Sequence, residues 1–248
     1  MFTTQPVIFF DETTSTNDVA SNYIANDDAT DGTLIITNFQ TKGRGQRGNK
    51  WQSTKGKNLL MSLILKPDWL NVREVFLLNM CIALGVYDYI ALKTDVHVNI
   101  KWPNDILCGT KKVAGILIEN TFRSNNLSWC IAGVGVNLNQ QKFDGTLNNA
   151  TSLQILSGLA FTPEEEALEL RGKIFYWYET LKSNNATAIK ETYHQRLFGL
   201  DERRNFKFKE DFIQGYIRGV DNSGRLVVEK ADGEIIFPDI KEIEYVFN

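Results

Sequence analysis

A glycine-rich basic loop lies between two apolar runs in the first third of the chain. The loop spans residues 40–53 and reads QTKGRGQRGNKWQS; residues 33–39 (TLIITNF) precede it and residues 59–65 (LLMSLIL) follow it. Apolar runs of this length, rich in branched side chains, are typical of β-strands. We therefore expect two strands joined by a loop that is available to a ligand.

The composition of the loop favours an anion that carries a flat ring. Arg44 and Arg47 offer paired donors to a phosphate or carboxylate, and Trp51 adds a flat apolar surface beside them. Three glycines permit sharp turns and let backbone N–H groups approach a ligand: Gly43, Gly45 and Gly48. A nucleotide suits these groups, but a solvated basic turn or a nucleic-acid-binding loop has the same composition.

The totals indicate an ordinary globular protein. Its 248 residues are 43% hydrophobic and 23% charged, enough for one large core or a core with a small appendage. The net charge is −3, so the basic loop is a local feature. A small anionic ligand is therefore favoured over nucleic acid.

The cysteines and histidines argue against a disulfide framework and a zinc site. Cys81, Cys108 and Cys130 lie far apart in apolar runs, which is typical of buried, reduced thiols in a cytoplasmic protein. His97 and His194 are not spaced as a metal pair.

No membrane association is expected. The N-terminus lacks a basic segment leading into an apolar one, so no signal peptide is visible. The longest apolar stretch, residues 76–91, contains Asn79 and Asp88 and is too short to span a bilayer.

Two polar clusters follow predicted strands. Ser15 or Thr16 can cap a helix that begins near Asn17, and a helix N-terminus is also a natural site for a polar ligand. Lys101 ends another apolar run and precedes the turn Pro-Asn-Asp at 103–105. A lone lysine at such a place is usually a surface residue.

Two later strands carry glycine in their interior. Gly115 lies within residues 112–119, where either a close approach to the backbone or a β-bulge accounts for it. Residues 128–139 alternate small with β-branched side chains and include G-x-G-x-N, which ends at Asn137. A bound ligand and close helix packing explain the missing bulk equally well.

The remaining pattern predicts an α+β fold in which helices flank a mixed β-sheet. Helices are expected over residues 71–92, 162–181 and 187–197; the first has a cap-like start at Asn71, and the second opens with a capping box and proline. After residue 200, short strands alternate with turns, which is typical of a small β-barrel. We expect domains at residues 1–200 and 201–248.

Four motifs in this order resemble those of biotin–protein ligases. They are S-T-N at 15–17, G-R-G-x-R-G at 43–48, K-W-P-N-D at 101–105 and G-x-G-x-N at 133–137. The resemblance covers nearly the whole chain, and the tail is similar to the SH3-like C-terminal domain of bacterial biotin ligases. It implies the class II synthetase-like catalytic fold. Because little precedes the first strand, it also implies a monofunctional ligase without an N-terminal DNA-binding domain.

The resemblance also implies roles for residues. Lys101 and Arg44 fall on catalytic positions, and Asp105 is either a metal ligand or a brace of the turn. The implied biotin-binding residues are Ser15, Thr16, Asn17, Gln40, Gly43, Arg44, Lys101 and Gly115. The implied ATP- and adenylate-binding residues are Arg44, Gly45, Arg47, Gly48, Trp51, Asn104 and Asn137.

The implied reaction joins biotin and ATP, with Mg²⁺, into biotinyl-5′-AMP and transfers biotin to a lysine of a biotin carboxyl carrier protein. The implied enzyme is a cytoplasmic monomer or homodimer without nucleic-acid or membrane partners. A lipoate or octanoyl ligase or transferase of the same fold is the first alternative, and a non-catalytic biotin-sensing or nucleic-acid-binding module is the second.

The loop departs from the family pattern where Gln46 and Asn49 replace cations found in some members, which weakens the expected retention of the adenylate. Its glycines and mutually repelling cations predict a segment that is mobile when empty and ordered over the adenylate.

Overall fold

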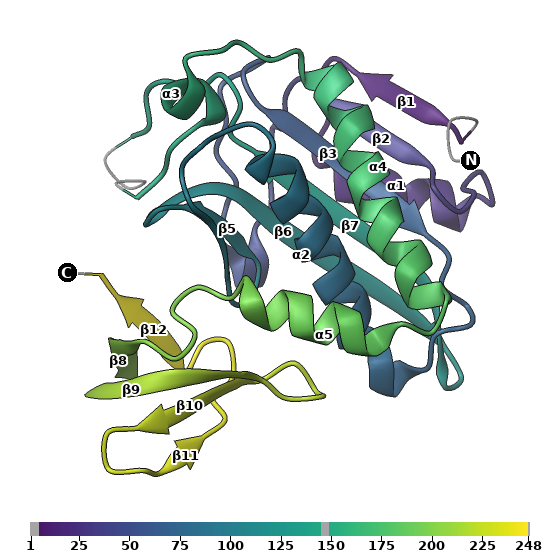
Figure 1. Ribbon diagram of the computed structural model, residues 1–248. Coiled ribbons are helices and arrows are strands. Elements are labelled where there is room, and N and C mark those ends of the chain that lie inside the picture. The colour runs from purple at the N-terminus through teal and green to yellow at the C-terminus, as the bar shows by residue number, and fades with distance from the viewer. Residues whose placement is uncertain (1–4, 145–148, 248) are drawn as a thin grey trace.

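The computed structural model describes residues 5–144 and 149–247, and a seven-stranded mixed sheet forms its centre (Figure 1). In spatial order its strands are β1 (Val7–Phe10), β2 (Leu34–Thr37), β3 (Leu59–Leu65), β7 (Asn126–Val136), β6 (Lys111–Arg123), β5 (Asp105–Cys108) and β4 (Val98–Lys101). Only β1 and β2 run parallel; the other neighbours are antiparallel. The mixed sheet predicted from sequence is confirmed.

Helices cover both faces of this sheet (Figure 1). One face carries α2 (Val75–Ala91), α4 (Pro163–Lys182) and α5 (Ala186–Gln195), and their apolar side chains form the main core. The other face carries α1 (Thr16–Ala25), which packs through Ala20 on a smaller cluster. A short helix, α3 (Leu153–Ser157), follows β7, and short 3₁₀ turns cover Gln46–Gly48 (η1) and Val72–Glu74 (η2).

The helix starts differ in part from those predicted. Asn71 does cap η2, because its side chain accepts a hydrogen bond from the backbone N–H of Arg73 at 3.0 Å. Thr162 and Ser15 stand at the N-cap positions of α4 and α1, but neither side chain makes a capping hydrogen bond. The predicted capping box at Thr162 is therefore wrong, because its side chain makes no capping bond. The polar side chains that follow Ser15 form hydrogen bonds within the pocket described below.

The helix expected over residues 71–92 is present at 72–91, but the expectation that its apolar stretch is too short to span a bilayer is wrong. With its 3₁₀ start it covers 20 residues and is long and apolar enough, by length and composition, to cross a membrane. That helix is 67% buried inside the molecule and packs against α4 and the sheet. The helix is apolar because it lies in the core of the protein.

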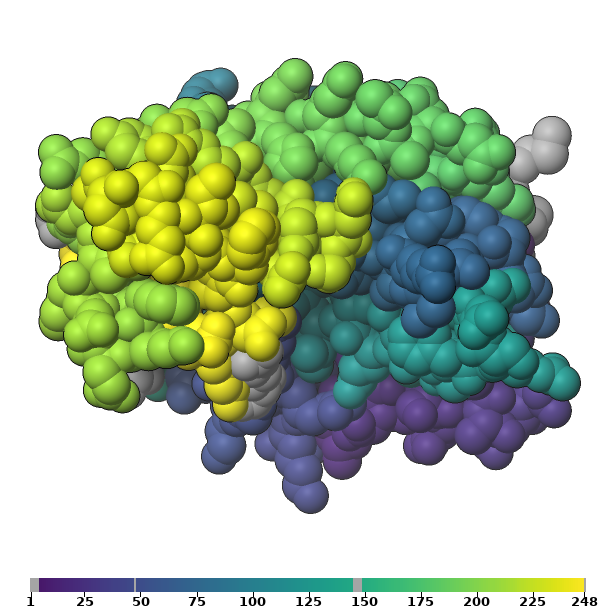
Figure 2. Space-filling view, turned by 90° about the horizontal axis from the view of Figure 1, so that it is seen from below, coloured from purple at the N-terminus to yellow at the C-terminus, as the bar shows by residue number. Residues whose placement is uncertain are grey.

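The tail is a separate five-stranded antiparallel sheet, in agreement with the predicted run of short strands. In spatial order it contains β11 (Ile235–Ile236), β10 (Leu226–Lys230), β9 (Asp211–Val220), β8 (Arg203–Phe208) and β12 (Ile243–Val246). Figure 2 shows this yellow lobe packed beside α5 on the underside of the molecule. The indole N–H of Trp102 donates to the carbonyl of Gly224 at 2.9 Å and ties the two sheets together.

The three cysteines are free and buried, as predicted. Burial raises the pKa of the Cys108 thiol to about 12, and it raises the pKa of Cys81 and Cys130 as well. These thiols therefore stay protonated and unreactive at neutral pH.

Candidate functional site

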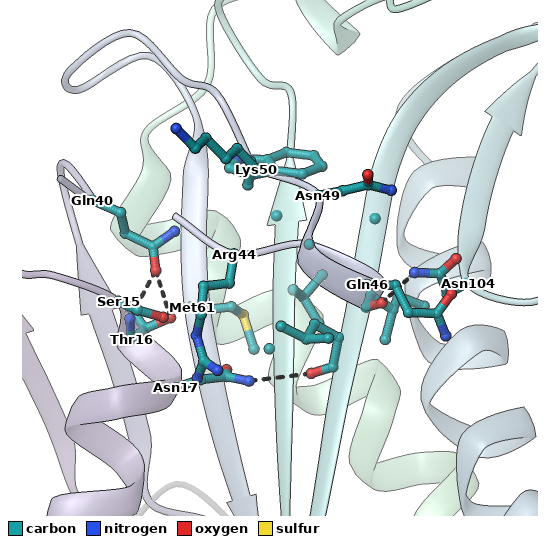
Figure 3. Close-up of a pocket in the computed structure, with 18 of the residues that line it drawn as sticks. Ser15, Thr16, Asn17, Gln40, Arg44, Gln46, Asn49, Lys50, Met61 and Asn104 are labelled. Atoms are coloured by element: carbon teal, nitrogen blue, oxygen red, sulfur yellow. Dashed lines mark hydrogen bonds between the residues drawn. The ribbon is translucent and has the colours of Figure 1, made fainter. Parts of the chain in front are cut away.

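A cavity of about 150 Å³ lies between the start of α1, the glycine loop and the strands β5, β6 and β7 (Figure 3). The loop separates this cavity from a wider, more open hollow of about 900 Å³ on its other side. Gln40, Arg44 and Trp51 line both spaces. The loop therefore borders both spaces, which we call the inner pocket (about 150 Å³) and the outer groove (about 900 Å³).

A buried corner of neutral polar groups forms one end of the inner pocket. The backbone N–H and the hydroxyl of Thr16 both donate to Oε1 of Gln40, at 2.7 and 3.2 Å. The Ser62 hydroxyl lies 2.7 Å from Thr16 Oγ1 and 2.6 Å from Asn17 Oδ1. Ser15, Thr16 and Asn17 are each 3% exposed. We call Ser15, Thr16, Asn17, Gln40 and Ser62 the polar corner.

The polar corner leaves room only for glycine at position 133 of β7. A Cβ atom at this position would lie 2.3 Å from Oδ1 of Asn17. Asn17 has no freedom to move away, because its Nδ2 donates to Glu119 at 2.7 Å while its Oδ1 accepts from Ser62. Close packing of a polar side chain on the strand therefore explains this glycine.

Arg44 is the charged side chain next to the corner. Its guanidinium makes a bidentate pair with Glu119 at 2.9 and 3.0 Å and reaches Asp18 at 2.8 Å. Glu119 also accepts from Asn17, so one carboxylate joins the loop to the corner. Two carboxylates and an exposed arginine form an arrangement that an incoming anion can compete with.

Trp51 lies across the glycines of the two central strands. A Cβ on Gly115 would come within 2.9 Å of the indole, and one on Gly135 within 2.5 Å. The indole Nε1 is buried and has no hydrogen-bond partner in the described part of the chain. The ring occupies the pocket floor, so a close approach, and not a bulge, accounts for Gly115.

The opposite end of the pocket is ionic. Asp105 accepts from Lys112 Nζ at 2.6 Å and lies 3.7 Å from Lys101 Nζ. Lys112 also stands 5.6 Å from the Trp51 ring centroid. Asp105 and Lys112 line the inner pocket, whereas Lys101 lies just behind Asp105 and lines neither space.

The donor set does not fit a metal held by the protein itself. Asp105 already serves two ammonium groups. In residues 5–144 and 149–247 no group of three or more His, Cys, Asp or Glu side chains is placed to hold a metal ion.

The other predicted residues divide between the pocket and its surroundings. Gly45 and Asn104 line the pocket, and the Asn104 amide donates to the carbonyl of Ile116 at 2.8 Å. Gly43 and Gly48 line the outer groove. Asn137 lines neither, because its buried amide donates to the carbonyl of Thr151 at 3.0 Å. The side chain of Arg47 lies outside the described residues.

Three residues of the site were missed from sequence. Ser62 is the one polar residue in the fully buried strand β3, and that isolated hydroxyl was a usable signal. Lys112 and Glu119 stand at the two ends of the K-x-A-G-I-L-x-E string at residues 112–119. Their part in the pocket depends on which way each side chain points from the strand.

Comparison with known proteins identifies one family. The biotin/lipoate A/B protein ligase family model matches residues 9–137. The bifunctional ligase/repressor BirA of Bacillus spizizenii is 31% identical over 239 residues, covering 92% of this chain and 71% of that protein. The biotin–[acetyl-CoA-carboxylase] ligase of Paracoccus denitrificans is 30% identical, covering 82% of this chain and 87% of that enzyme.

A solved structure extends the agreement to the fold. The biotin protein ligase from Aquifex aeolicus in complex with biotin and ATP superimposes with a TM-score of 0.78. That match is 26% identical in sequence and covers 97% of this chain and 99% of the other. The chain belongs to the biotin/lipoate A/B protein ligase family.

Proposed function

We propose that this protein is a biotin–protein ligase that activates biotin with ATP. A carboxylate oxygen of biotin attacks the α-phosphorus of ATP, the bond to the bridging oxygen breaks, and pyrophosphate leaves. The product is biotinyl-5′-AMP. The amine of an acceptor lysine then attacks the acyl carbon and loses a proton, and AMP leaves. The acceptor is a biotin carboxyl carrier protein or domain.

The observation that carries the proposal is a neutral polar corner at one end of the pocket and the ammonium group of Lys112, paired with Asp105, at the other. Biotin has the matching polarity, with a neutral ureido ring at one end and a carboxylate at the other. We assign the ring to Ser15, Thr16, Asn17 and Gln40. We assign the carboxylate to the opposite end of the pocket, on the side of Lys112. Hydrogen bonds among the corner residues hold these groups before the ligand arrives, which lowers the cost of ordering them.

The chemical obstacle is the approach of two anions, biotin's carboxylate and the triphosphate. Cations that face the α-phosphate reduce the repulsion and stabilise the charge of the transition state. We assign the stabilisation of this charge to Arg44 and Lys112. Lys101, which lies behind Asp105, and Arg47, which belongs to the loop, are assigned to the same role. Mg²⁺ enters with ATP as part of the substrate, since Asp105 is already paired with lysines.

Adenine is assigned to the outer groove beside Trp51, with the backbone of Gly43, Gly45 and Gly48 along the phosphates. Because Trp51 lies on Gly115 and Gly135 in this structure, binding at the pocket floor requires the indole to shift. Asn104 borders the pocket and is kept in the assignment. Asn137 supports the chain behind the pocket, so its role toward the nucleotide is indirect.

The wider assignments belong to the same proposal. They are a catalytic domain of residues 1–200, a tail domain of residues 201–248, a cytoplasmic location, a monomer or homodimer, and no nucleic-acid or membrane partner. The net charge of −3 supports the absence of a nucleic-acid partner.

Biotin-dependent exchange between ATP and pyrophosphate tests the proposal. Exchange with biotin and Mg²⁺, and none with lipoate or without acid, is the expected result. Exchange with lipoate alone would keep the fold and transfer the substrate assignment to a lipoate ligase. A folded protein that binds biotin without exchange would be a binding module, and the proposal would be wrong.

A further inference from the structure

Lys101 lies at the junction between the two sheets. It is the last residue of β4, and both of its chain neighbours are bonded to the part of the chain that leads into or belongs to the tail. The N–H of Phe198 donates to the carbonyl of Ile100 at 2.8 Å, and the Trp102 indole donates to Gly224. The position of the Lys101 backbone therefore depends on how the tail packs.

The Lys101 side chain depends on the tail as well. Its Nζ stands 5.2 Å from the ring centroid of Tyr245 and 5.9 Å from that of Phe247. These two rings are stacked with an angle of 22° between their planes and a centroid separation of 6.4 Å. An ammonium group at this distance from ring faces is attracted by the negative charge above each ring.

Asp105 alone does not account for the position of Lys101. Its carboxylate is 2.6 Å from Lys112 but 3.7 Å from Lys101, close to the limit for an ion pair. The pair with Lys101 is the weaker of the two, because Coulomb energy falls with distance. The rings of Tyr245 and Phe247 provide the additional attraction that holds the Lys101 ammonium in place.

The rings are also held firmly enough to position a side chain. Tyr245 lies in β12 opposite Phe206 of β8 and contacts that ring at a centroid distance of 5.5 Å. Phe198 braces both rings, with centroids 6.0 Å from Tyr245 and 5.8 Å from Phe247. Phe247 is still 37% exposed, so core packing by itself does not explain an aromatic residue there.

We propose that Tyr245 and Phe247 are positioning residues that hold the ammonium of Lys101 at the edge of the pocket. The tail sheet thereby becomes part of the machinery of the adenylation reaction. This inference deepens the proposed function and rests on it for the role of Lys101 in catalysis. The contact between the rings and the lysine stands independently of any substrate.

Chemical labelling of the substrate-free protein tests the contact directly. Acetic anhydride competes for lysine amines, and mass spectrometry compares Lys101 with exposed Lys66 as an internal reference. We choose Phe247→Leu because it removes the ring from a half-exposed site. Labelling of Lys101 should then rise by roughly two- to fivefold, the factor that corresponds to one lost cation–π contact. Phe247→Tyr keeps a ring and should restore the wild-type value.

Exchange kinetics test the consequence for catalysis. With Phe247→Leu, kcat should fall by about two- to fivefold while the KM for biotin stays unchanged, because Lys101 lies outside the pocket lining. Phe212→Leu is the matched control, since this residue lies on the same sheet and is 77% exposed, whereas the rings near Lys101 are those of Tyr245 and Phe247. A change in the biotin KM equal to that in kcat would contradict positioning.

Different results would overturn the proposed ligase function and the positioning role of Tyr245 and Phe247. A wild-type protein without exchange would overturn the proposed function, whereas the labelling result would still be interpretable. Unchanged labelling and kcat in folded Phe247→Leu would overturn the positioning role, as would a Phe247→Tyr variant that behaves like Phe247→Leu. Thermal unfolding establishes that each variant is folded.

Discussion

The polar corner and the glycine loop face each other across one pocket, yet they are held in opposite ways. In the corner, residues that are 3% exposed bond to one another through short neutral hydrogen bonds. In the loop, the side chains of Thr41, Lys42, Arg44, Asn49 and Lys50 are exposed. Its backbone is held by the bridge between Arg44 and Lys50 and by the bond from the Trp51 N–H to Gly43, and its main side-chain anchor is Arg44 on two carboxylates.

The two halves of the site therefore differ in their tolerance to substitution. A buried network loses a full hydrogen bond and leaves an unsatisfied partner when one member is removed. An exposed ion pair contributes little, since water and salt replace it. We therefore expect biotin binding to depend on the rigid corner, and ATP use to depend on a loop that rearranges.

Substitution of Gly133, in the strand that packs against the polar corner, should reduce biotin binding most. In Gly133→Val the new Cβ would lie 2.3 Å from Asn17 Oδ1, so Asn17 must leave its bonds to Ser62 and Glu119. The loss of these two hydrogen bonds, one buried and one part-buried, costs about 3 kcal/mol, which predicts a loss of biotin affinity of roughly a hundredfold. Titration calorimetry with biotin measures it.

Gly172→Ala is the matched control for that glycine substitution. Gly172 lies in α4, and an added Cβ would meet no atom within 4 Å. Alanine is the better helix former, so the free energy of unfolding should rise by about 0.5–1 kcal/mol while biotin binding stays unchanged. Wild-type biotin affinity in Gly133→Val would show that Asn17 does not belong to the binding site.

The second effect concerns the loop in the wild-type protein. Trypsin should cut the empty protein at Lys42, Arg44 or Lys50, which are exposed. Biotin and ATP together should slow this cleavage by about tenfold or more, because closure over the adenylate removes the open form that the protease needs. Gel analysis of timed digests measures it, with biotin alone and ATP alone as controls. Equal cleavage in all four conditions would refute ordering of the loop.

The third prediction concerns Ser62, the residue of β3 that bonds to Thr16 and Asn17 in the polar corner. In Ser62→Ala the hydroxyl of Thr16 and the amide oxygen of Asn17 each lose a buried partner. The free energy of unfolding should fall by about 1–2 kcal/mol and the biotin affinity by roughly tenfold, with the KM for ATP unchanged. Ser183→Ala, at the exposed end of α4, is the control and should leave biotin binding intact. A change confined to ATP would reverse the assignment of the two halves.

Sequence patterns predicted the elements of the fold because burial leaves a periodic trace in a chain. The strand–loop–strand unit at 33–65, the core helix after Asn71 and the short strands of the tail all follow from such traces. The boundaries moved by a few residues, since they depend on hydrogen bonds such as the one that Asn71 accepts.

Side-chain directions in the pocket were less predictable, and β6 shows why. Lys112 and Gly115 are three residues apart, so regular alternation would send their side chains to opposite faces. A β-bulge places Val113 as an extra residue between the pairs Leu107–Lys112 and Ile106–Ala114, so the alternation slips by one. Lys112 consequently points into the pocket beside Gly115.

Lys101 and Asn137 illustrate a second limit. Motif matching put both of them at the site, yet each is governed by distant chain segments. The contacts of Lys101 come from Tyr245 and Phe247, and the amide of Asn137 is bound by Thr151. Contacts between residues so far apart in sequence depend on how the two sheets and the loop after β7 pack, which no local pattern records.

The smallest expected effect comes from loosening the loop's side-chain anchor. Glu119→Gln removes the charge that Arg44 pairs with at 2.9 Å while it keeps a similar shape and leaves Asp18 in place. Since Glu119 is 37% exposed, the lost pair is worth about 0.5–1 kcal/mol, and trypsin should cut the empty loop roughly two- to fivefold faster. The difference should shrink in high salt, because exposed ion pairs are screened.

Asp11→Asn is the matched control for Glu119→Gln, because Asp11 forms an exposed pair with Lys55 at 2.6 Å outside the pocket. Cleavage within the loop should be unaffected by that change. Glu119 also accepts from Asn17, so the same variant measures how far the corner and the loop are coupled. A loss of biotin affinity as large as that expected for Ser62→Ala would mean that Glu119 belongs to the rigid corner. A faster digest with nearly normal biotin affinity would mean that the corner keeps its geometry when the loop is released, as its separate hydrogen bonds require.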